Sequence, residues 1–299
     1  MQITDGKISI PVPALFSFQE CLHFLDRGYD DCLYSIGDGY VIKPLEIGGK
    51  KQLIRIKEGT NSLEVEMLNE KPEPLILQLV GRWVEDWFDL NRDLTLFYKL
   101  LDEHAQLSFM VENFRGLRLM GIPNLFEALC WCVIGQQINL TFAHRLKRRL
   151  VETYGTAISY QGQPYYYFPK PEVLAELDVE QLKTLQFSRQ KAEYTIGIAT
   201  AFARGELSKD KVKSQPSSEQ MLQKLQRIRG VGKWTANYVL MKSLARMDCI
   251  PYGDSGLNTA VASFLKLDRK PTQQEVNNFF APFNGWESYL VIYLWRTLS

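Results

Sequence analysis

A glycine-containing turn between two helical segments is the part of this sequence best suited to binding an anion. Gly230, Val231 and Gly232 form the turn, and the second helical segment starts at Lys233 or Trp234. Glycine permits positive φ and leaves backbone amides uncovered, and the first amides of a helix lack partners within the helix. Since a helix N-terminus also carries partial positive charge, we expect this turn to bind a phosphate oxygen without reading base sequence.

Asp254 is the candidate catalytic acid. It follows Pro251, which ends an apolar helical segment, and it precedes another helical segment. A carboxylate at such a position can stabilise a positive charge that develops during a reaction, and it can orient or deprotonate water. The alternative is a helix N-cap. The two roles are compatible, because a helix N-terminus also favours a negative charge.

The elements that position these residues follow from periodicity. The first eighty or so residues contain segments of alternating polarity, with Gly48 and Gly49 as a turn between two of them. The expected strands are Tyr40–Lys43, Lys51–Lys57 and Leu63–Met67. One helix is expected after Ser17, because Ser17 and Glu20 form a capping-box pattern. The sequence therefore predicts an antiparallel sheet with one helix at the amino-terminal end.

From about Trp87 the pattern is helical almost to the end of the chain. Helices are expected over residues 124–134, 140–154, 171–177, 179–184, 189–204, 272–280 and 286–298. The polar, tyrosine-rich segment 156–167 is expected to be a loop. The fold class is thus α+β and mainly α.

Composition excludes few functions. The net charge is +1, with 45% hydrophobic and 23% charged residues, which is ordinary for a globular protein. Two basic segments, His144–Arg149 and Ser188–Lys191, could contact phosphates or form solvated helix faces. The sequence has no apolar run of membrane-spanning length and no amino-terminal signal pattern, so we expect a cytoplasmic protein that does not enter a membrane.

Several ordered motifs resemble those of helix-hairpin-helix DNA glycosylases, and in particular the 3-methyladenine DNA glycosylase II family. They are Phe114–Leu119, Ile134–Ile138, Phe168–Glu172, Ser188–Ala192, the hairpin Gly230–Tyr238 and Trp286–Tyr289. The resemblance covers roughly residues 87–299, and the amino-terminal sheet is similar to the family's non-catalytic domain more loosely. It implies that Asp254 is the catalytic aspartate.

The resemblance also implies how the damaged base is held. Trp234, Tyr238 and Trp295 match aromatic residues of the base pocket, although packing between helices is the ordinary role of such residues. Aromatic faces attract cations such as alkylated purines by about 0.5–2 kcal/mol. Arg296 departs from relatives that have a tyrosine there, which leaves the lesion range open. Where bifunctional relatives have a Schiff-base lysine, this chain has Trp234, so we expect water to be the nucleophile.

Two further roles come from the resemblance. Gln137 aligns with the side chain that fills the stack after the base has flipped out. Its alternative role is to cap the helix that ends at Gly135. The family also binds a monovalent cation, Na⁺ or K⁺, through backbone carbonyls at positions matching Gln226, Ile228 and Val231, although the reaction requires no cofactor. Gly230, Val231, Gly232 and Lys233 would bind the DNA phosphate.

These features predict a monofunctional DNA glycosylase of base excision repair. It would hydrolyse the glycosidic bond of alkylated purines, such as 3-methyladenine and 7-methylguanine, in double-stranded DNA, and act as a monomer near the nucleoid. Two alternatives remain: an 8-oxoguanine glycosylase/lyase, and a non-catalytic helix-hairpin-helix DNA-binding protein. The expected divisions are a non-catalytic domain at 1–88, a helical subdomain with Asp254 at 89–116 and 247–299, and a helical subdomain at 117–246 with the hairpin at about 219–246.

Overall fold

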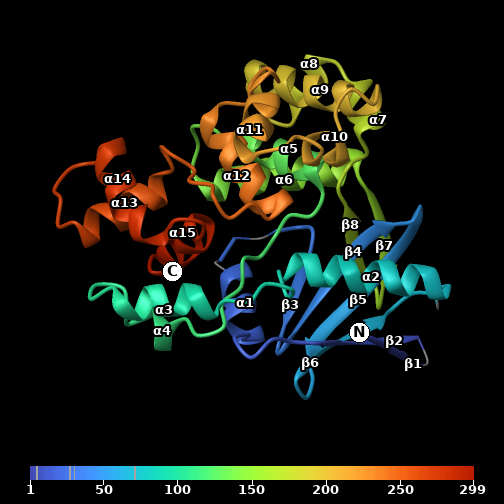
Figure 1. Ribbon diagram of the computed structural model, residues 1–299. Helices are drawn as coiled ribbons and strands as arrows, with labels where there is room; N and C mark the ends of the chain where they lie inside the picture. Colours follow the sequence, from blue (N-terminus) through green and yellow to red (C-terminus); the bar gives the residue numbers. More distant parts are fainter. Residues whose placement is uncertain (5, 27, 30, 71) are drawn as a thin grey trace. The chain divides into compact units, whose positions relative to one another are not determined.

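The computed structural model describes every residue of the chain except 5, 27, 30 and 71 (Figure 1). The chain divides by its contacts into two compact units, each made of several segments. Unit 1 comprises residues 1–12, 25–86 and 126–208, and unit 2 comprises residues 13–24, 87–125 and 209–299. This division does not test the three subdomains expected from the sequence, which stay a prediction.

An antiparallel sheet forms the amino-terminal part of unit 1. Its strands are β1 (Gln2–Thr4), β2 (Lys7–Pro11), β3 (Ser35–Gly37), β4 (Tyr40–Ile47), β5 (Lys50–Glu58) and β6 (Ser62–Met67). They lie in the order β1-β2-β6-β5-β4-β3, and every pair is antiparallel. Gly48 and Gly49 have positive φ and form the turn between β4 and β5, as predicted. Ile8, Val65 and Ile56 are buried on successive strands.

The helices of unit 1 follow the predicted boundaries closely after residue 124. They are α2 (Pro74–Trp87, whose last residue is assigned to unit 2), α5 (Leu125–Gly135), α6 (Leu140–Tyr154), α7 (Pro171–Ala175), α8 (Val179–Thr184) and α9 (Arg189–Ala203). Helix α2 was not predicted; its first turn contains Pro74, which suits a helix start because the missing N–H has no partner there.

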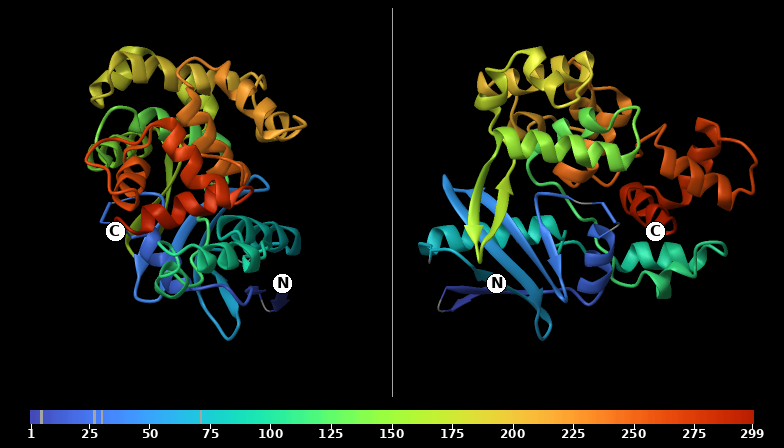
Figure 2. Two further views of the ribbon diagram at one scale, coloured as in Figure 1. Left: turned by 60° about the vertical axis from the view of Figure 1, so that its left-hand side comes forward. Right: turned by 180° about the vertical axis from the view of Figure 1, so that it is seen from behind.

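The prediction of a loop over residues 156–167 was wrong. The segment forms a hairpin of β7 (Thr156–Tyr160) and β8 (Gln163–Tyr167), visible from behind in Figure 2. Gln161 and Gly162 both have positive φ, which is the conformation of a two-residue hairpin turn. The polar residues of the segment suggested a loop. Its tyrosines favour strands, and they support the β-ribbon that is observed.

Among its described residues, the secondary-structure elements of unit 2 are all helices. It contains α1 (Phe18–Leu25, whose last residue is assigned to unit 1), α3 (Thr95–Glu103), α4 (Met110–Asn113), α10 (Lys209–Lys213), α11 (Ser218–Gln226), α12 (Lys233–Leu244), α13 (Ser255–Phe264), α14 (Gln273–Phe280), a 3₁₀ turn η1 (Ala281–Phe283) and α15 (Glu287–Arg296). Helix α15 is buried along almost its whole length, from Ser288 to Trp295, which places it in the core of the unit. None of the described helices is long and apolar enough to cross a membrane.

The capping box predicted at the start of α1 forms only in part. The Ser17 hydroxyl accepts a hydrogen bond from the backbone N–H of Glu20 (3.1 Å), as an N-cap does. The Glu20 carboxylate does not return this bond. It accepts a hydrogen bond from Arg296 (3.0 Å), and the backbone N–H of Ser17 donates instead to the carbonyl of Gly116 (2.9 Å). A long-range ion pair of Glu20 has therefore replaced the local hydrogen bond that the capping box predicts.

Candidate active site

The turn between α11 and α12 has the conformation expected from its glycines. Gly230 has φ +90°, whereas Gly232 has φ −86° and is the N-cap residue of α12, which starts at Lys233. No side chain caps this helix end, and a Cβ added at Gly232 would meet no atom within 4 Å. The turn thus exposes uncapped amides at a positive helix end, an arrangement that suits a phosphate group.

Asp254 lies between the aromatic side chains that the sequence grouped with it. It is the N-cap of α13, and its Oδ1 accepts a hydrogen bond from the N–H of Leu257 (2.8 Å). The indole Nε1 of Trp295 also donates to Oδ1 (2.9 Å), and the indole Nε1 of Trp234 donates to Oδ2 (3.3 Å). The carboxylate is half-buried. The N-cap bond is therefore present, and two indole N–H groups orient the same carboxylate. The catalytic role of Asp254 stays a prediction.

Three aromatic rings form a continuous surface beside this carboxylate. The ring centroids of Trp234 and Tyr238 are 5.4 Å apart with an interplanar angle of 28°, and those of Tyr238 and Trp295 are 6.1 Å apart at 39°. Trp234 and Tyr238 are half-buried, while Trp295 is 9% exposed. Flat rings that are partly open to solvent can stack on a planar base, and the two indoles also orient the acid that would act on its sugar.

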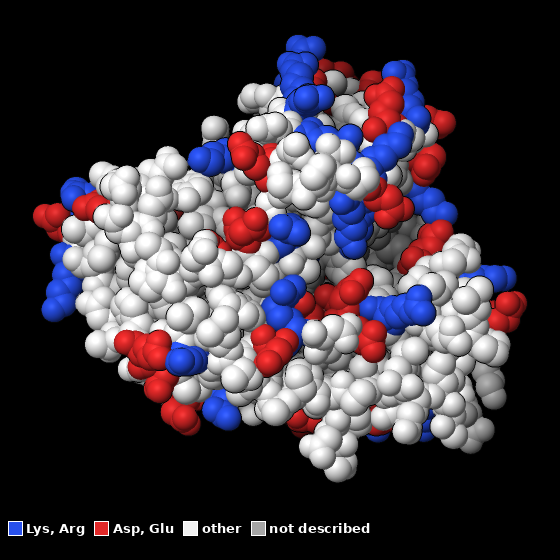
Figure 3. Space-filling view, in the orientation of Figure 1, with Lys and Arg blue, Asp and Glu red and all other residues white. Residues whose placement is uncertain are grey.

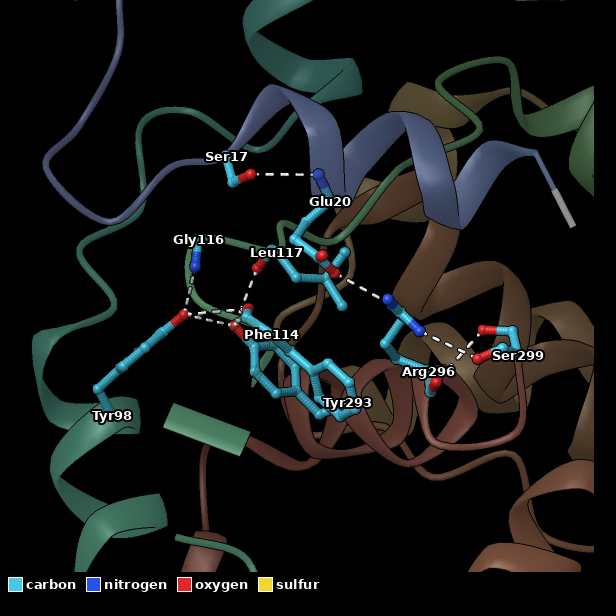
Figure 4. A network of polar contacts seen from close by, with 9 residues as sticks. All are labelled: Ser17, Glu20, Tyr98, Phe114, Gly116, Leu117, Tyr293, Arg296 and Ser299. Atoms are coloured by element: carbon cyan, nitrogen blue, oxygen red, sulfur yellow. Dashed lines mark hydrogen bonds and ion pairs between the residues drawn. The ribbon is translucent and has the colours of Figure 1, made fainter. Parts of the chain in front are cut away.

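Helix α15, which holds Trp295, is anchored by a polar network (Figure 4). The hydroxyl of Tyr293 contacts that of Tyr98 (2.8 Å) and donates to the carbonyl of Leu117 (3.2 Å), and the N–H of Gly116 donates to Tyr98 (2.6 Å). Burial raises the pKa of Tyr293 well above its ordinary value, so its hydroxyl remains a hydrogen-bond donor. These bonds fix the register of the helix one turn or less from the indole that contacts Asp254.

Arg296, at the end of α15, contacts Glu20 and Phe114, which lie outside the three-ring surface. Its guanidinium forms an ion pair with Glu20 (3.0 Å) and lies 4.9 Å from the centroid of the Phe114 ring, as Figure 4 shows. The arginine that replaces the family's tyrosine therefore has its charge paired with Glu20 of the same chain. Lys233 lies with its Nζ 4.7 Å from the centroid of the Tyr252 ring, which is where a cation–π contact holds it.

Two basic side chains that the sequence offers as candidate phosphate contacts bind other groups within the protein. Lys147 is buried and forms an ion pair with Asp31, and its ammonium lies 4.9 Å from the Trp131 ring centroid. Lys191 donates to carbonyls at the end of α5. Helical periodicity alone could not separate these residues from exposed ones, because long side chains reach partners far away in sequence.

Gln137 lies in unit 1, in the turn between α5 and α6, with φ +57° and an exposed side chain. Among the described residues its side chain makes no hydrogen bond to the end of α5, while its left-handed backbone suits a residue that follows a helix end. The insertion into the stack and the capping role both stay predictions. The proposed cation site remains untested. Within it, the carbonyl of Ile228 already accepts a hydrogen bond from the N–H of Val231 (3.0 Å).

The acid has one oxygen available for chemistry. Oδ1 accepts two hydrogen bonds, whereas Oδ2 accepts only the longer bond from Trp234. A carboxylate oxygen can accept about two, so Oδ2 can still contact a water or a developing positive charge. On the face in Figure 3, Lys and Arg side chains are interspersed with Asp and Glu.

The chain is similar to known DNA repair proteins. Residues 130–284 match the model of the HhH-GPD superfamily base excision DNA repair proteins, and residues 40–129 match the model of the 8-oxoguanine DNA glycosylase N-terminal domain. A DNA-3-methyladenine glycosylase of Bacillus subtilis is 38% identical over 297 residues, covering 98% of each chain.

Two solved structures show the same fold. The 3-methyladenine DNA glycosylase of Archaeoglobus fulgidus superimposes with a TM-score of 0.83 at 21% identity, covering 97% of each chain. The 8-oxoguanine glycosylase/lyase of Clostridium acetobutylicum in complex with DNA gives a TM-score of 0.75 at 19% identity, covering 94% of this chain and 91% of that one. On the match of its central and carboxy-terminal residues and on its full-length similarity to the Bacillus protein, the chain belongs to the HhH-GPD superfamily of base excision DNA repair proteins.

Proposed function

We propose that the protein is a monofunctional DNA glycosylase that hydrolyses the N-glycosidic bond of alkylated purines in base excision repair. The observation that carries this proposal is a half-buried carboxylate, Asp254, held by two indole N–H groups whose rings continue into a stacking surface with Tyr238. The names of relatives support the choice of substrate, including the Bacillus protein and the DNA-3-methyladenine glycosylase 2 of Escherichia coli, which is 29% identical over 184 residues.

The rings suit an electron-poor base. Alkylation gives the purine a formal positive charge and weakens its bond to the sugar, and three adjacent aromatic faces attract a cationic ring more than a neutral one. As the bond breaks, positive charge develops on the sugar. Asp254 would stabilise this charge through Oδ2 and orient the attacking water, while the bonds to Oδ1 keep the carboxylate fixed during the reaction.

The residue at the start of α12 favours hydrolysis over lyase chemistry. A Schiff base needs an amine beside the sugar, and the side chain that contacts Asp254 from this helix is the indole of Trp234. The neighbouring amine of Lys233 lies against the Tyr252 ring. The match to an 8-oxoguanine glycosylase domain model concerns residues 40–129, a region without Asp254, so it does not favour the lyase alternative.

The remaining parts of the proposal concern DNA. The uncapped amides at Gly232–Trp234 would bind a phosphate, with a Na⁺ or K⁺ ion at the carbonyls of Gln226, Ile228 and Val231. Gln137 would fill the gap left by the flipped base. We further propose that the protein acts as a monomer in the cytoplasm.

The decisive experiment is Asp254→Asn, which keeps the size of the side chain and removes its charge. We expect single-turnover release of 7-methylguanine from duplex DNA to fall by several orders of magnitude, while binding to the damaged duplex persists. The natural control is Asp248→Asn, at an exposed acid in the same unit. A rate above about a tenth of wild type in Asp254→Asn would remove this residue from catalysis.

A lesion panel separates hydrolysis from lyase activity. We expect fast release of 3-methyladenine and 7-methylguanine, an abasic product that stays uncut until alkali is added, and no covalent species trapped by borohydride. Dominant release of 8-oxoguanine opposite cytosine would favour the alternative enzyme. A trapped adduct lost in Lys233→Ala but kept in Asp254→Asn would show that Lys233 is the nucleophile.

A further inference from the structure

Lys191 forms an unusual contact with the end of a neighbouring helix in unit 1. From the first turn of α9, its Nζ donates to the carbonyls of Val133 (3.1 Å), Ile134 (2.5 Å) and Gln136 (2.6 Å). The side chain is half-buried, and among the described residues no carboxylate forms an ion pair with it. All three N–H groups of this lysine donate to backbone carbonyls, so that Lys191 of α9 caps the carboxy-terminal end of α5.

The end of α5 needs such a cap. The last carbonyls of a helix have no partners within the helix, and many helices solve this with a glycine of positive φ. Here Gly135 is not among the residues with positive φ, and the left-handed residue is Gln137 (φ +57°). An ammonium group has three N–H donors, which equals the number of carbonyls that it contacts, and it also complements the negative helix end.

Burial lowers the pKa of Lys191 to about 8, because the charged group has lost water. The protein thus keeps a partly desolvated ammonium directly against the turn between α5 and α6. The other side of the turn is fixed as well. Asn139 is the N-cap of α6, and its Oδ1 accepts a hydrogen bond from the N–H of Phe142 (2.8 Å).

These contacts hold a short segment between two fixed ends. The carbonyl of Gln136 is bound by Lys191, Asn139 is bound to α6, and Gln137 lies between them with an exposed side chain in a conformation that residues other than glycine rarely adopt. When the Gln137 side chain enters a DNA stack, its backbone loses little further conformational freedom because it is already ordered, so that mainly the side-chain rotamers become restricted.

We propose that Lys191 is a positioning residue that clamps the turn at residues 136–138 and thereby presents Gln137 to the DNA duplex. The proposal rests on the role given to Gln137 in the proposed function. It assigns no chemical step to Lys191. Its effect should appear only where a base pair must be opened and the gap filled.

The test compares two DNA substrates with one lesion. In the first, 7-methylguanine is paired with cytosine in a duplex, and in the second it lies opposite an abasic site, where there is no pair to open. For Lys191→Met we expect single-turnover excision to fall at least tenfold on the paired substrate and by less than twofold on the unpaired one. Lys191→Arg retains N–H donors and should recover much of the loss. Lys183→Met is the matched control in the same unit, since Lys183 lies on α8, outside the two basic segments, and pairs with Glu180 at the surface.

A second measurement is independent of activity. Amide hydrogen exchange at residues 136–138 should be faster in Lys191→Met than in wild type, and unchanged in Lys183→Met. On the paired substrate the double variant Lys191→Met/Gln137→Ala should be no slower than the slower single variant, because both changes disable one device.

Equal losses of Lys191→Met on both substrates, wild-type activity on the paired one, or unchanged exchange at residues 136–138 would overturn the proposal. Failure of the proposed function looks different: wild-type protein would release no base from either substrate. The exchange measurement would then still decide whether the clamp exists, and a Gln137→Ala variant with full activity on paired DNA would refute the link to base flipping.

Discussion

Asp254 uses its two carboxylate oxygens unequally. Oδ1 is fully engaged by a backbone amide and by Trp295, whereas Oδ2 has a single, longer bond to Trp234. In the proposed mechanism the fixed oxygen would hold the group in place and the other oxygen would face the sugar. Catalytic groups that are oriented before the reaction need no reorganisation as charge develops, which is why the donors to Oδ1 matter for rate.

Trp295→Phe should therefore slow the reaction without abolishing it. The change keeps an aromatic face and removes the N–H donor to Oδ1, and a hydrogen bond to a charged group contributes about 1.5–3 kcal/mol. We expect single-turnover excision to fall by roughly ten- to a hundredfold, with little change in the affinity for abasic product DNA. Trp286→Phe, at the N-cap of the same helix, should keep the wild-type rate. A loss of affinity with an unchanged rate would show that Trp295 acts through stacking alone.

The residues of this site were predictable to different degrees. Asp254 and its N-cap bond follow from local sequence, since both partners lie within one turn of helix. The bonds from Trp234 and Trp295 do not, because they connect positions 20 and 41 residues apart through the fold. The positions of Gln137 and Lys191 follow from motifs, but only the structure shows that Lys191 donates hydrogen bonds to the carbonyls at the end of α5.

At the scale of elements, periodicity predicted most helices of the carboxy-terminal two thirds within two residues. Periodicity failed where contacts between residues in the folded chain, and not the local composition, decide the structure. The β7–β8 hairpin forms because its turn at Gln161 and Gly162 adopts positive φ, a property that a count of polar residues does not register. The carboxylate of Glu20 leaves its local cap for Arg296, because a long-range ion pair is available in the folded chain.

The two glycines of the α11–α12 turn should behave differently when replaced. Gly230 has φ +90°, so Gly230→Ala should destabilise the protein by roughly 1–2 kcal/mol and lower the melting temperature by a few degrees. Gly232 has φ −86° with open space around it, so Gly232→Ala should fold normally. Its new methyl group would obstruct the exposed amides, and we expect weaker binding to damaged and undamaged duplexes alike. Normal DNA affinity in folded Gly232→Ala would place the phosphate elsewhere.

At the scale of the whole molecule, each compact unit is assembled from three separate segments of the chain. Unit 1 is joined in part by the buried ion pair of Asp31 and Lys147, which come from different segments. Burial would raise the pKa of Asp31, but the attraction and hydrogen bond of Lys147 outweigh it and lower the pKa below the ordinary value of 3.8. The pair therefore stabilises the protein above that pH, and its contribution is lost as the pH falls through the lowered pKa.

Asp31→Asn should be costly because it leaves the Lys147 ammonium buried without its counter-ion. We expect the free energy of unfolding at neutral pH to fall by roughly 3–5 kcal/mol, measured by urea denaturation. The difference from wild type should begin to shrink below about pH 4, where Asp31 of the unfolded chain takes up a proton, and should keep shrinking as the pH falls through the lowered pKa of Asp31 in the folded protein. Glu180→Gln breaks an exposed pair with Lys183 and should change stability by less than about 1 kcal/mol. A small effect of Asp31→Asn would show that water or another group compensates for the lost charge.

The ring surface beside Asp254 should also make tryptophan fluorescence report on binding of the base. Two of the six tryptophans, Trp234 and Trp295, contact the same carboxylate and share Tyr238 as a neighbouring ring. An electron-poor purine stacked on these indoles would accept an electron from their excited state and quench their emission. Mixing the protein rapidly with lesion-containing DNA should therefore show arrival of the flipped base as a loss of fluorescence before any bond is broken. In Asp254→Asn that signal should appear and then persist, because the base stays in place.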